Sequence, residues 1–360
     1  MTFQPHRLVF ARKRRQWTQV DLARSIGVVA RTIQRYECSE ETPPLDQIER
    51  IAAKLEFPVE FFLEEQGFPE IPPPSLSFRA YSKLKVRLRE NAVAVAQMSV
   101  EIEAALSEQF ELPLLDVPDL RESAATAADA ARLLREEWAL GSAPVPNMVH
   151  LLEGHGVRVF SLAEDVADVD AFCFWFERRA FLVLNQLKSG ERSRFDAAHE
   201  LGHLCLHRHI DFGGKDVERE ADAFAAEFLV PEKALSLQLP PVITLETIFK
   251  LKRFWKVSAM AMVRRLKDIG RLSDWVYRSM CMQLSRDGYR SHEKGGIDPE
   301  TSSLLADMIQ GEDGIAASDI ARALRVRVTD ISPLIFGIPQ VRGHLRLVTS
   351  RRAADRRTAG

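Results

Sequence analysis

Residues 195–207 read FDAAHELGHLCLH, and this stretch decides the fold of the middle of the chain. On an α-helix, side chains at i and i+4 point the same way, so His199 and His203 can offer two imidazoles to one metal ion. Glu200 lies beside the open coordination position, where it can accept a proton from an attacking water molecule. Gly202 has no side chain and so allows another segment to approach closely. We therefore predict a buried helix that carries a metal site.

A second helical stretch is expected to complete this site. It reads EREADAFAAEFLVP, residues 218–231. Catalytic zinc usually has three protein ligands and one open position, and Glu218 is the expected third ligand. Asp222, one turn later on the same face, is expected to accept the free N–H of a ligating histidine and so fix its tautomer. Glu220 points elsewhere on this helix and is the rival ligand.

Two neighbours of the histidine pair are given other roles. His207 lies one turn beyond His203, but a His203–His207 pair would leave Glu200 without a role. His207 is therefore interpreted as a residue of the site rim or the surface, and Cys205 as a core residue. The four cysteines are scattered and no CxxC occurs, which is typical of reduced thiols in a cytosolic protein.

These motifs resemble a known family. The resemblance rests on DAFCFW (170–175), FLVLN (181–185), RSRFDAAHELGHLCLH (192–207) and EREADAFAAEFLVP, and covers roughly residues 130–275. It is to the ImmA/IrrE metallopeptidases, gluzincin-like zinc proteases of bacteria and their phages. It implies that His199, His203 and Glu218 hold zinc and that Glu200 is the general base. It also implies a substrate strand added along the FLVLN edge, and a substrate that is a repressor of the phage-repressor type.

The N-terminal part of the chain carries a different pattern. Residues 18–36 read TQVDLARSIGVVARTIQRY. Thr18 can cap a helix that Gln19 opens, Gly27 allows a turn, and a second helix is expected from Val28 to Tyr36. This pattern looks like a helix-turn-helix of the XRE or phage-repressor type. LDQIERIAAKLEFPVEFFL (45–63) matches the remaining helices of that five-helix domain.

In such folds the start of the second helix enters the major groove of DNA. The expected DNA-contacting residues are Arg31, Thr32 and Arg35, with Ala30 close to the bases and Gln19 on a phosphate at the groove edge. Residues 1–36 carry eight Lys or Arg side chains against one acid, and residues 12–15 are expected to add charge against the DNA backbone. The alternative is that this helix-turn-helix is a protein-protein module.

The remaining segments complete a mainly helical chain with an α+β centre. Apolar residues make up 46 % of the 360 residues and charged residues 28 %, as in globular proteins of two or three domains. Short β-branched or aromatic runs predict a small mixed sheet from 156–160, 171–176 and 179–185. Helical patterns cover about 80–110, 119–140, 147–154, 191–206, 216–229, 245–285 and 298–340.

We predict four parts along the chain. These are the XRE-type helix-turn-helix DNA-binding domain (1–66), a Pro-rich linker and long helix (67–112), a gluzincin-like zinc metallopeptidase domain (113–275) and a helical C-terminal accessory region with a basic tail (276–360). The prolines of GFPEIPPPSLS (67–77) indicate the linker, and SFRAYSK (77–83) is similar to a segment that often joins these two domains. SDIARALRV (318–326) indicates either a degenerate DNA-binding or dimerisation unit or a helical cap.

Together these patterns predict a cytoplasmic DNA-binding endopeptidase and regulator, dependent on Zn2+, that cleaves a repressor-type protein to control gene expression. The expected partners are double-stranded operator DNA, the repressor substrate and a second copy of the chain. We expect no signal peptide and no membrane partner, because no stretch approaches the roughly 18 apolar residues of a membrane helix. Two alternatives stay open: a regulator whose zincin-like domain is a sensor or scaffold without proteolysis, and a toxin–antitoxin or phage-defence component.

Overall fold

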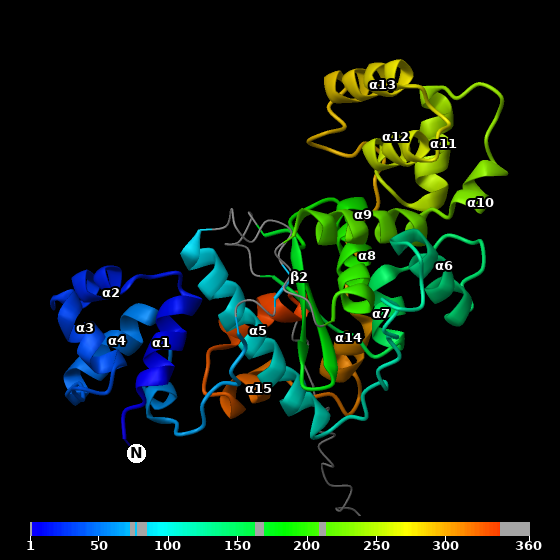
Figure 1. Cartoon of the computed structure of the whole chain (residues 1–360). Helices are drawn as coiled ribbons and strands as arrows, with labels where there is room; N and C mark the ends of the chain where they lie inside the picture. The colour runs from blue at the N-terminus through cyan, green and yellow to red at the C-terminus, as the bar shows by residue number, and fades with distance from the viewer. Residues whose placement is uncertain (1, 73–75, 78–84, 163–168, 209–213, 339–360) are drawn as a thin grey trace, which may run out of the picture.

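The computed structural model describes residues 2–72, 76–77, 85–162, 169–208 and 214–338. The chain is mainly helical, with one small sheet near its centre (Figure 1). The elements are α1 (Pro5–Arg14), α2 (Gln19–Ile26), α3 (Ala30–Glu37), α4 (Leu45–Leu55), η1 (Val59–Leu63), α5 (Val86–Ser107), α6 (Ala127–Glu137), α7 (Met148–Gly154), β1 (Arg158–Ser161), β2 (Ala171–Phe176), β3 (Arg179–Leu184), α8 (Gly190–Leu206), α9 (Lys215–Leu229), α10 (Glu232–Ser236), α11 (Leu245–Trp255), α12 (Ala259–Asp268), α13 (Asp274–Arg286), α14 (Ser303–Gln310), α15 (Ala317–Ala323), α16 (Val328–Ile331) and η4 (Ser332–Ile335). The prediction of a mainly helical chain with a small mixed sheet is confirmed.

The sheet has the strand order β1–β3–β2. β1 runs parallel to β3, with Arg158 opposite Phe181, and β2 runs antiparallel to β3, with Cys173 opposite Leu182. The prediction that a substrate strand adds along FLVLN (181–185) is therefore wrong, because β3 is the central strand and both its sides are already hydrogen-bonded. A short apolar run does not by itself distinguish a central strand from an edge strand.

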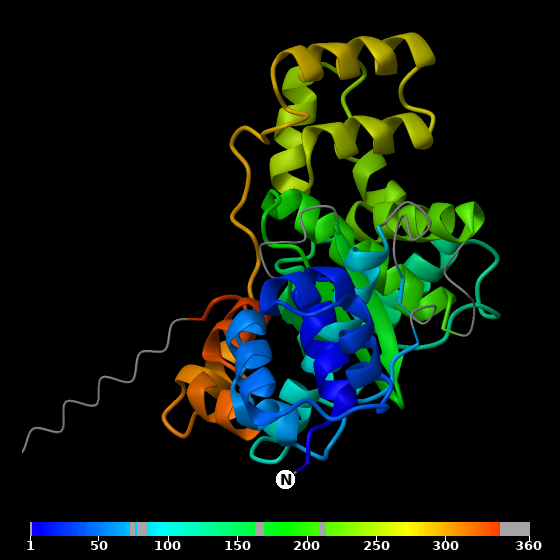
Figure 2. The ribbon, with the colours of Figure 1, turned by 90° about the vertical axis from the view of Figure 1, so that its left-hand side faces the viewer.

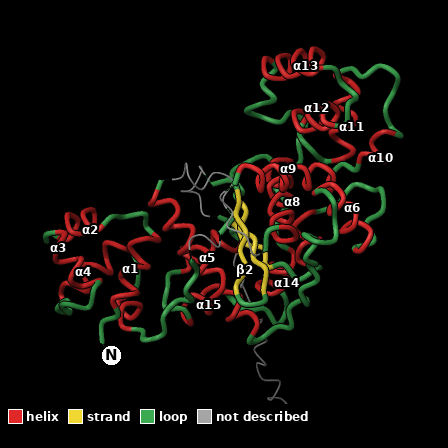
Figure 3. Tube along the Cα trace, viewed as in Figure 1, coloured by secondary structure: helices red, strands yellow, loops and turns green. Residues whose placement is uncertain are grey.

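The two faces of the sheet belong to two different cores. Successive side chains of a strand point to opposite faces, and both faces of these strands are apolar. One face packs with α8 and α9 and carries Val159, Ala171, Cys173, Ala180, Leu182 and Leu184. The other face carries Phe160, Phe172, Phe174, Phe181 and Val183, and joins α5, the N-terminal helices and the C-terminal helices in one cluster. Figure 3 shows the strands between α5 and α8.

The N-terminal helical region consists of α1 to η1. Thr18 caps α2, since its hydroxyl accepts the Asp21 N–H at 3.1 Å and its own N–H donates to the Asp21 carboxylate at 2.8 Å. Gly27 ends α2 in the left-handed region, at φ +76°. α3 begins at Ala30 rather than at the predicted Val28, because the preceding Val29 is extended.

The 22-residue helix α5 connects this region to the sheet. Near its start, the Asn91 side chain donates to the Arg14 carbonyl at 2.6 Å. Near its end, the buried Glu103 carboxylate pairs with Arg158 at 3.1 Å and with Arg179 at 2.5 Å, both from the sheet. A buried carboxylate needs such partners, so α5 is held at both ends by polar contacts.

The C-terminal half leaves the sheet and then returns to it. Helices α11 to α13 stand beyond α9 (Figure 1), and Figure 2 shows the chain after α13 running back to the C-terminal helices. Of these, α14 contacts α7, α15 contacts α5 and η4 contacts β1. Two contacts confirm the return: the Arg15 guanidinium pairs with Asp330 at 2.5 Å, and the Ser161 hydroxyl donates to the Pro333 carbonyl at 2.6 Å. The predicted tail (351–360) and all but the first residue of SFRAYSK lie outside the described residues. Among the helices described, none is long and apolar enough to cross a membrane.

Candidate metal centre and active site

Helix α8 is almost completely buried between the sheet and α9. Ser189 caps its start by accepting the Arg192 N–H. Cys205 is fully buried, so the prediction that it is a core residue is confirmed. A Cβ atom added at Gly202 would lie 3.1 Å from the Phe224 ring of α9. The close approach that we expected at this glycine is therefore made by α9.

Three side chains from α8 and α9 converge. The Nε2 atoms of His199 and His203 lie 3.1 Å apart, and each lies 3.5 Å from one oxygen of Glu218. One ligand atom from each of the three residues lies within 4.8 Å of the other two. His199 and His203 are 1 % and 0 % exposed. The structure thus brings together the three predicted ligands, while Glu220, the rival, turns to another partner.

Asp222 sets the orientation of His199. Its carboxylate lies 2.9 Å from His199 Nδ1, so this nitrogen carries the proton and donates it to the carboxylate. The His199 Nε2 lone pair then faces the point where the three side chains converge. This is the arrangement that we expected of Asp222, one turn after Glu218.

His203 is oriented by a longer chain of contacts. Glu220 lies 2.9 Å from His207 Nε2, which therefore donates and leaves the Nδ1 lone pair of His207 to accept. That atom lies 3.0 Å from His203 Nδ1, so His203 donates there and turns its own Nε2 lone pair to the convergence point. Burial lowers the pKa of His207, and the contact with Glu220 opposes this shift. The interpretation of His207 as a rim or surface residue is wrong: it is 1 % exposed, because α9 covers the end of α8.

The donor set fits a divalent cation. Two Nε2 lone pairs 3.1 Å apart repel each other unless a cation or proton lies between them. Both oxygens of Glu218 are buried atoms without a hydrogen bond of normal geometry, and a cation would satisfy them. Burial alone would raise the pKa of Glu218, but the two imidazoles outweigh it and lower the pKa to about 2. Glu218 is therefore a carboxylate at neutral pH, as a metal ligand must be.

Glu200 lies on the same helix and is 2 % exposed. Its carboxylate accepts a hydrogen bond from the hydroxyl of Ser77. The Ser77 hydroxyl is also 3.2 Å from the Cys173 thiol, which donates to the Glu200 carbonyl at 3.4 Å. Burial and the nearby Glu200 charge raise the pKa of Cys173, so it stays a thiol. Sequence reasoning missed Ser77 and Cys173, because 96 residues separate them and no motif connects them.

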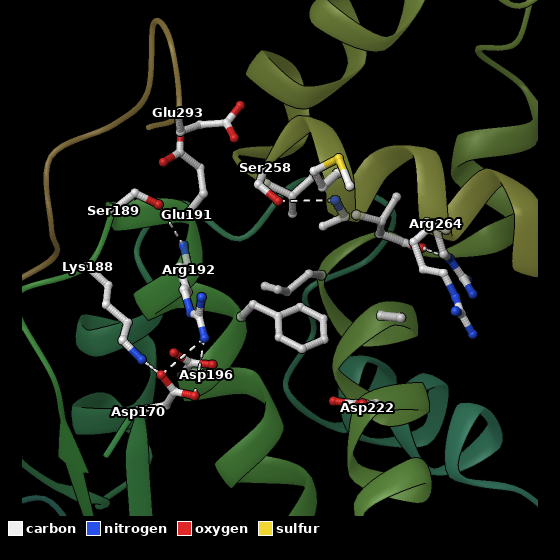
Figure 4. Close-up of a pocket in the computed structure, with 18 of the residues that line it drawn as sticks. Asp170, Lys188, Ser189, Glu191, Arg192, Asp196, Asp222, Ser258, Arg264 and Glu293 are labelled. Atoms are coloured by element: carbon white, nitrogen blue, oxygen red, sulfur yellow. Dashed lines mark hydrogen bonds and ion pairs between the residues drawn. The ribbon is translucent and has the colours of Figure 1, made fainter. Parts of the chain in front are cut away.

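A cavity of about 980 Å³ adjoins this centre, between the first half of α8, α9 and α12. Figure 4 shows Arg192 and Lys188 directed towards Asp170 on one wall and Arg264 on another. Asp222 lines the cavity, and its side chain is 45 % exposed. Solvent therefore reaches the carboxylate that orients His199, although His199 itself is buried.

The residues expected to contact DNA lie on the N-terminal helices. On α3, Arg31 and Arg35 are exposed, whereas Thr32 and Ala30 are half-buried. Arg35 pairs with Glu41 at 2.9 Å. On α2, the amide of Gln19 donates to Glu37 at 2.7 Å, so this side chain is engaged within the region. DNA contact by these five residues stays a prediction.

The residues at 12–15 are buried or paired within the protein, contrary to the expectation that they add charge against DNA; Lys13 pairs with Glu90 at 3.3 Å. Arg12 is buried and forms two hydrogen bonds with the Glu37 carboxylate, at 2.6 and 3.0 Å. Arg14 is buried, and Arg15 pairs with Asp330 of the C-terminal helices. The basic run RKRR therefore serves mainly to attach α1 to its neighbours. Arg12 pairs with Glu37 on α3, and Arg15 pairs with Asp330 on α16.

Comparison with known families identifies the centre of the chain. Residues 152–267 match the family described as the IrrE N-terminal-like domain, Peptidase_M78. This range holds the sheet, α8, α9 and the three converging side chains, and it suggests a metallopeptidase. It covers about a third of the chain, and the N-terminal helices lie outside it. A search of curated proteins found no match.

Proposed function

We propose that this chain is a DNA-binding zinc endopeptidase that cleaves a repressor-type protein and thereby controls gene expression. One observation carries the proposal: His199, His203 and Glu218 converge next to Glu200 inside a Peptidase_M78 match. Two imidazoles and one carboxylate are the ligand set of zinc in many hydrolytic centres. A zinc ion bound there would supply Lewis acidity, which polarises a carbonyl and makes water a better nucleophile at neutral pH.

The side chains of the protein supply the remaining chemistry. Asp222 and the Glu220–His207 pair keep the Nε2 lone pairs of His199 and His203 directed at the metal position. Glu200 accepts the proton of the attacking water and delivers it to the amine that leaves when the peptide bond breaks. Glu200 is buried, so its surroundings have a lower dielectric constant than water. Its electrostatic effect on charges that develop on the substrate during the reaction is therefore larger than it would be in water.

The substrate is proposed to bind as an extended strand along β2. Among the described strands β2 is an edge strand, it packs against α8, and its Cys173 thiol lies 3.4 Å from the Glu200 carbonyl, so this edge is close to Glu200. Backbone pairing to a sheet edge gives affinity without requiring a particular sequence. A repressor-type substrate is the expectation from family resemblance, and the N-terminal helices, through Arg31 and Arg35, are proposed to bring the enzyme to DNA.

Metal analysis and a base-free variant test this function. We expect about one zinc per chain in the wild type and in Glu200→Gln, and none in Glu218→Ala. Glu200→Gln should lose cleavage of the repressor, by about 10²–10⁴-fold, while it keeps the metal and DNA binding. Wild-type protein that takes up no zinc from a zinc-containing buffer would refute the enzyme proposal.

A second candidate is a regulator that does not cleave protein. The observation that favours it is the burial of Glu200 under Ser77, which leaves the carboxylate without access to a substrate in this conformation. The two functions differ in their response to Glu200→Gln. If the regulatory phenotype survives in this variant, regulation without proteolysis is the function, and the zinc centre is a sensor or a scaffold.

A further inference from the structure

Leu76 and Ser77 belong to the segment between the N-terminal helices and α5, yet both are buried at the candidate active site. They are 1 % and 0 % exposed. The Ser77 N–H donates to the Cys173 carbonyl at 3.0 Å, and the Cys173 N–H donates to the Ser77 hydroxyl at 2.8 Å. The N–H and C=O of one strand residue point to the same side. Cys173 therefore presents both groups to Ser77, at the edge of β2 that faces away from β3.

The same serine also reaches the catalytic carboxylate. Its hydroxyl donates to Glu200, and its oxygen is 3.2 Å from the Cys173 thiol. One residue thus occupies both backbone groups of Cys173 that an added strand would use, one through its own N–H and one through its hydroxyl. It also covers the group that would accept the proton of the attacking water. A substrate strand cannot pair with Cys173 while Ser77 does, because Cys173 has only one N–H to donate.

We propose that the edge of β2 at Cys173, on the side away from β3, and the Glu200 carboxylate form a peptide-binding site whose resident occupant is the chain's own Leu76–Ser77 segment. A protein substrate must displace this segment to reach Glu200. The inference rests on the proposed peptidase function and adds the identity of the internal competitor. The enzyme is therefore held in a low-activity state by its own interdomain segment.

The geometry around Ser77 also predicts a preference among substrates. The side chain opposite Cys173 is fully buried, and its one heavy atom beyond Cβ already contacts Glu200 and the Cys173 thiol. A larger side chain would have to displace one of these groups, at a cost typical of overpacking. The site therefore selects Gly, Ala or Ser at the substrate position that replaces Ser77.

The N-terminal helices are positioned to influence this occupant. The first turns of α5, which follows the segment in the chain, are attached to α1 and α2 by two ion pairs. Lys13 lies 3.3 Å from Glu90, and Arg87 lies 3.2 Å from Asp21. The helix that follows Ser77 in the chain is therefore tied to α1 and α2 at its start.

The test uses the zinc-loaded full chain and a peptidyl hydroxamate as the probe. The hydroxamate group binds the metal, and the peptide part needs the β2 edge. Ser77→Pro removes both the N–H and the hydroxyl, and Ser77→Ala removes the hydroxyl alone. Ser161→Ala is the matched control, because Ser161 is a buried, hydrogen-bonded serine on the opposite edge strand β1. Thermal melting confirms that each variant is folded.

Two readouts are expected to change in the Ser77 variants only. Ser77→Pro should bind the hydroxamate about tenfold more tightly than the wild type, which corresponds to about 1.4 kcal/mol. Hydrogen exchange of the Cys173 amide, measured without metal, should accelerate about tenfold in both Ser77 variants because this N–H loses its acceptor.

Failures of the two proposals are distinguishable. Equal hydroxamate affinity in the wild type and in Ser77→Pro, with zinc bound in both, would overturn this inference and leave the metallopeptidase proposal intact. Equal exchange of the Cys173 amide would also overturn it. If no form of the protein takes up zinc, the proposed function fails, and the internal competitor fails with it.

Discussion

The α8–α9 centre and the exposed face of α3 differ in how their polar side chains are held. In the centre, each of the two histidines expected to hold metal has a second partner, Asp222 for His199 and His207 for His203. On α3, Arg31 is exposed and Arg35 pairs only at the surface. The difference teaches that buried groups are oriented by contacts within the protein, whereas α3 presents Arg31 and Arg35 to solvent.

The largest effect is expected at Glu103, whose buried carboxylate connects α5 to the sheet. Glu103→Ala removes the carboxylate that Arg158 and Arg179 share. Removing one partner of a buried pair usually costs about 3–5 kcal/mol. We expect about 3 kcal/mol here, because Arg179 is 30 % exposed and keeps some hydration. Chemical denaturation measures the loss.

Glu177→Ala is the matched control for this prediction. Glu177 also pairs with Arg179, at 3.0 Å, but its side chain is 69 % exposed. Exposed pairs contribute about 0–1 kcal/mol, so the free energy of unfolding should change little. Equal losses in the two variants would show that burial does not separate them, and would remove the basis of the comparison.

A smaller effect is expected from the residue that orients His203. His207→Ala removes the acceptor for His203 Nδ1, so the imidazole loses its fixed tautomer. Loss of such an outer partner typically lowers metal affinity about 10–100-fold. A zinc titration against a competing chelator measures this. His150→Ala, at an exposed position of α7, should leave the affinity unchanged, and an unchanged affinity in His207→Ala would contradict the role assigned to His207.

Glu220→Ala tests the contact that orients His207, and through it His203. Glu220 determines which nitrogen of His207 carries the proton, and its side chain is 57 % exposed, so water can replace it in part. We expect zinc affinity to fall by about tenfold or less, towards the lower end of the range for outer partners. Complete loss of zinc in Glu220→Ala, with zinc kept in Glu218→Ala, would make Glu220 the ligand instead.

The smallest effect is expected on the α3 face. If Arg31 contacts a DNA phosphate, Arg31→Ala should reduce the slope of log affinity against log salt by about 1 and weaken binding across all duplex sequences. Titrations of labelled duplex at several salt concentrations measure the slope. Arg322→Ala, an exposed arginine on α15 that pairs with Asp319, is the control. An identical slope in Arg31→Ala would support the protein-protein alternative.

Local spacing was enough to predict much of the centre. The i, i+4 rule applied to His199 and His203, and again to Glu218 and Asp222, identified side chains that the structure brings together. Thr18, Gly27 and the short aromatic runs likewise indicated where helices and strands begin and end, because caps, turns and strand propensity act within a few residues.

What the sequence did not indicate depends on contacts between distant segments. β3 becomes the central strand only when the sheet forms. His207 is buried only when α9 packs on α8, and Arg12 is buried against Glu37 only when the N-terminal helices pack. The contact of Ser77 with Glu200 spans 123 residues. The sequence predicted the three side chains that converge and the helices that carry them, since the spacing within each helix is local. Only the tertiary structure decided which strand edge is open and what occupies it, because edge positions and buried polar partners depend on the arrangement of the whole chain.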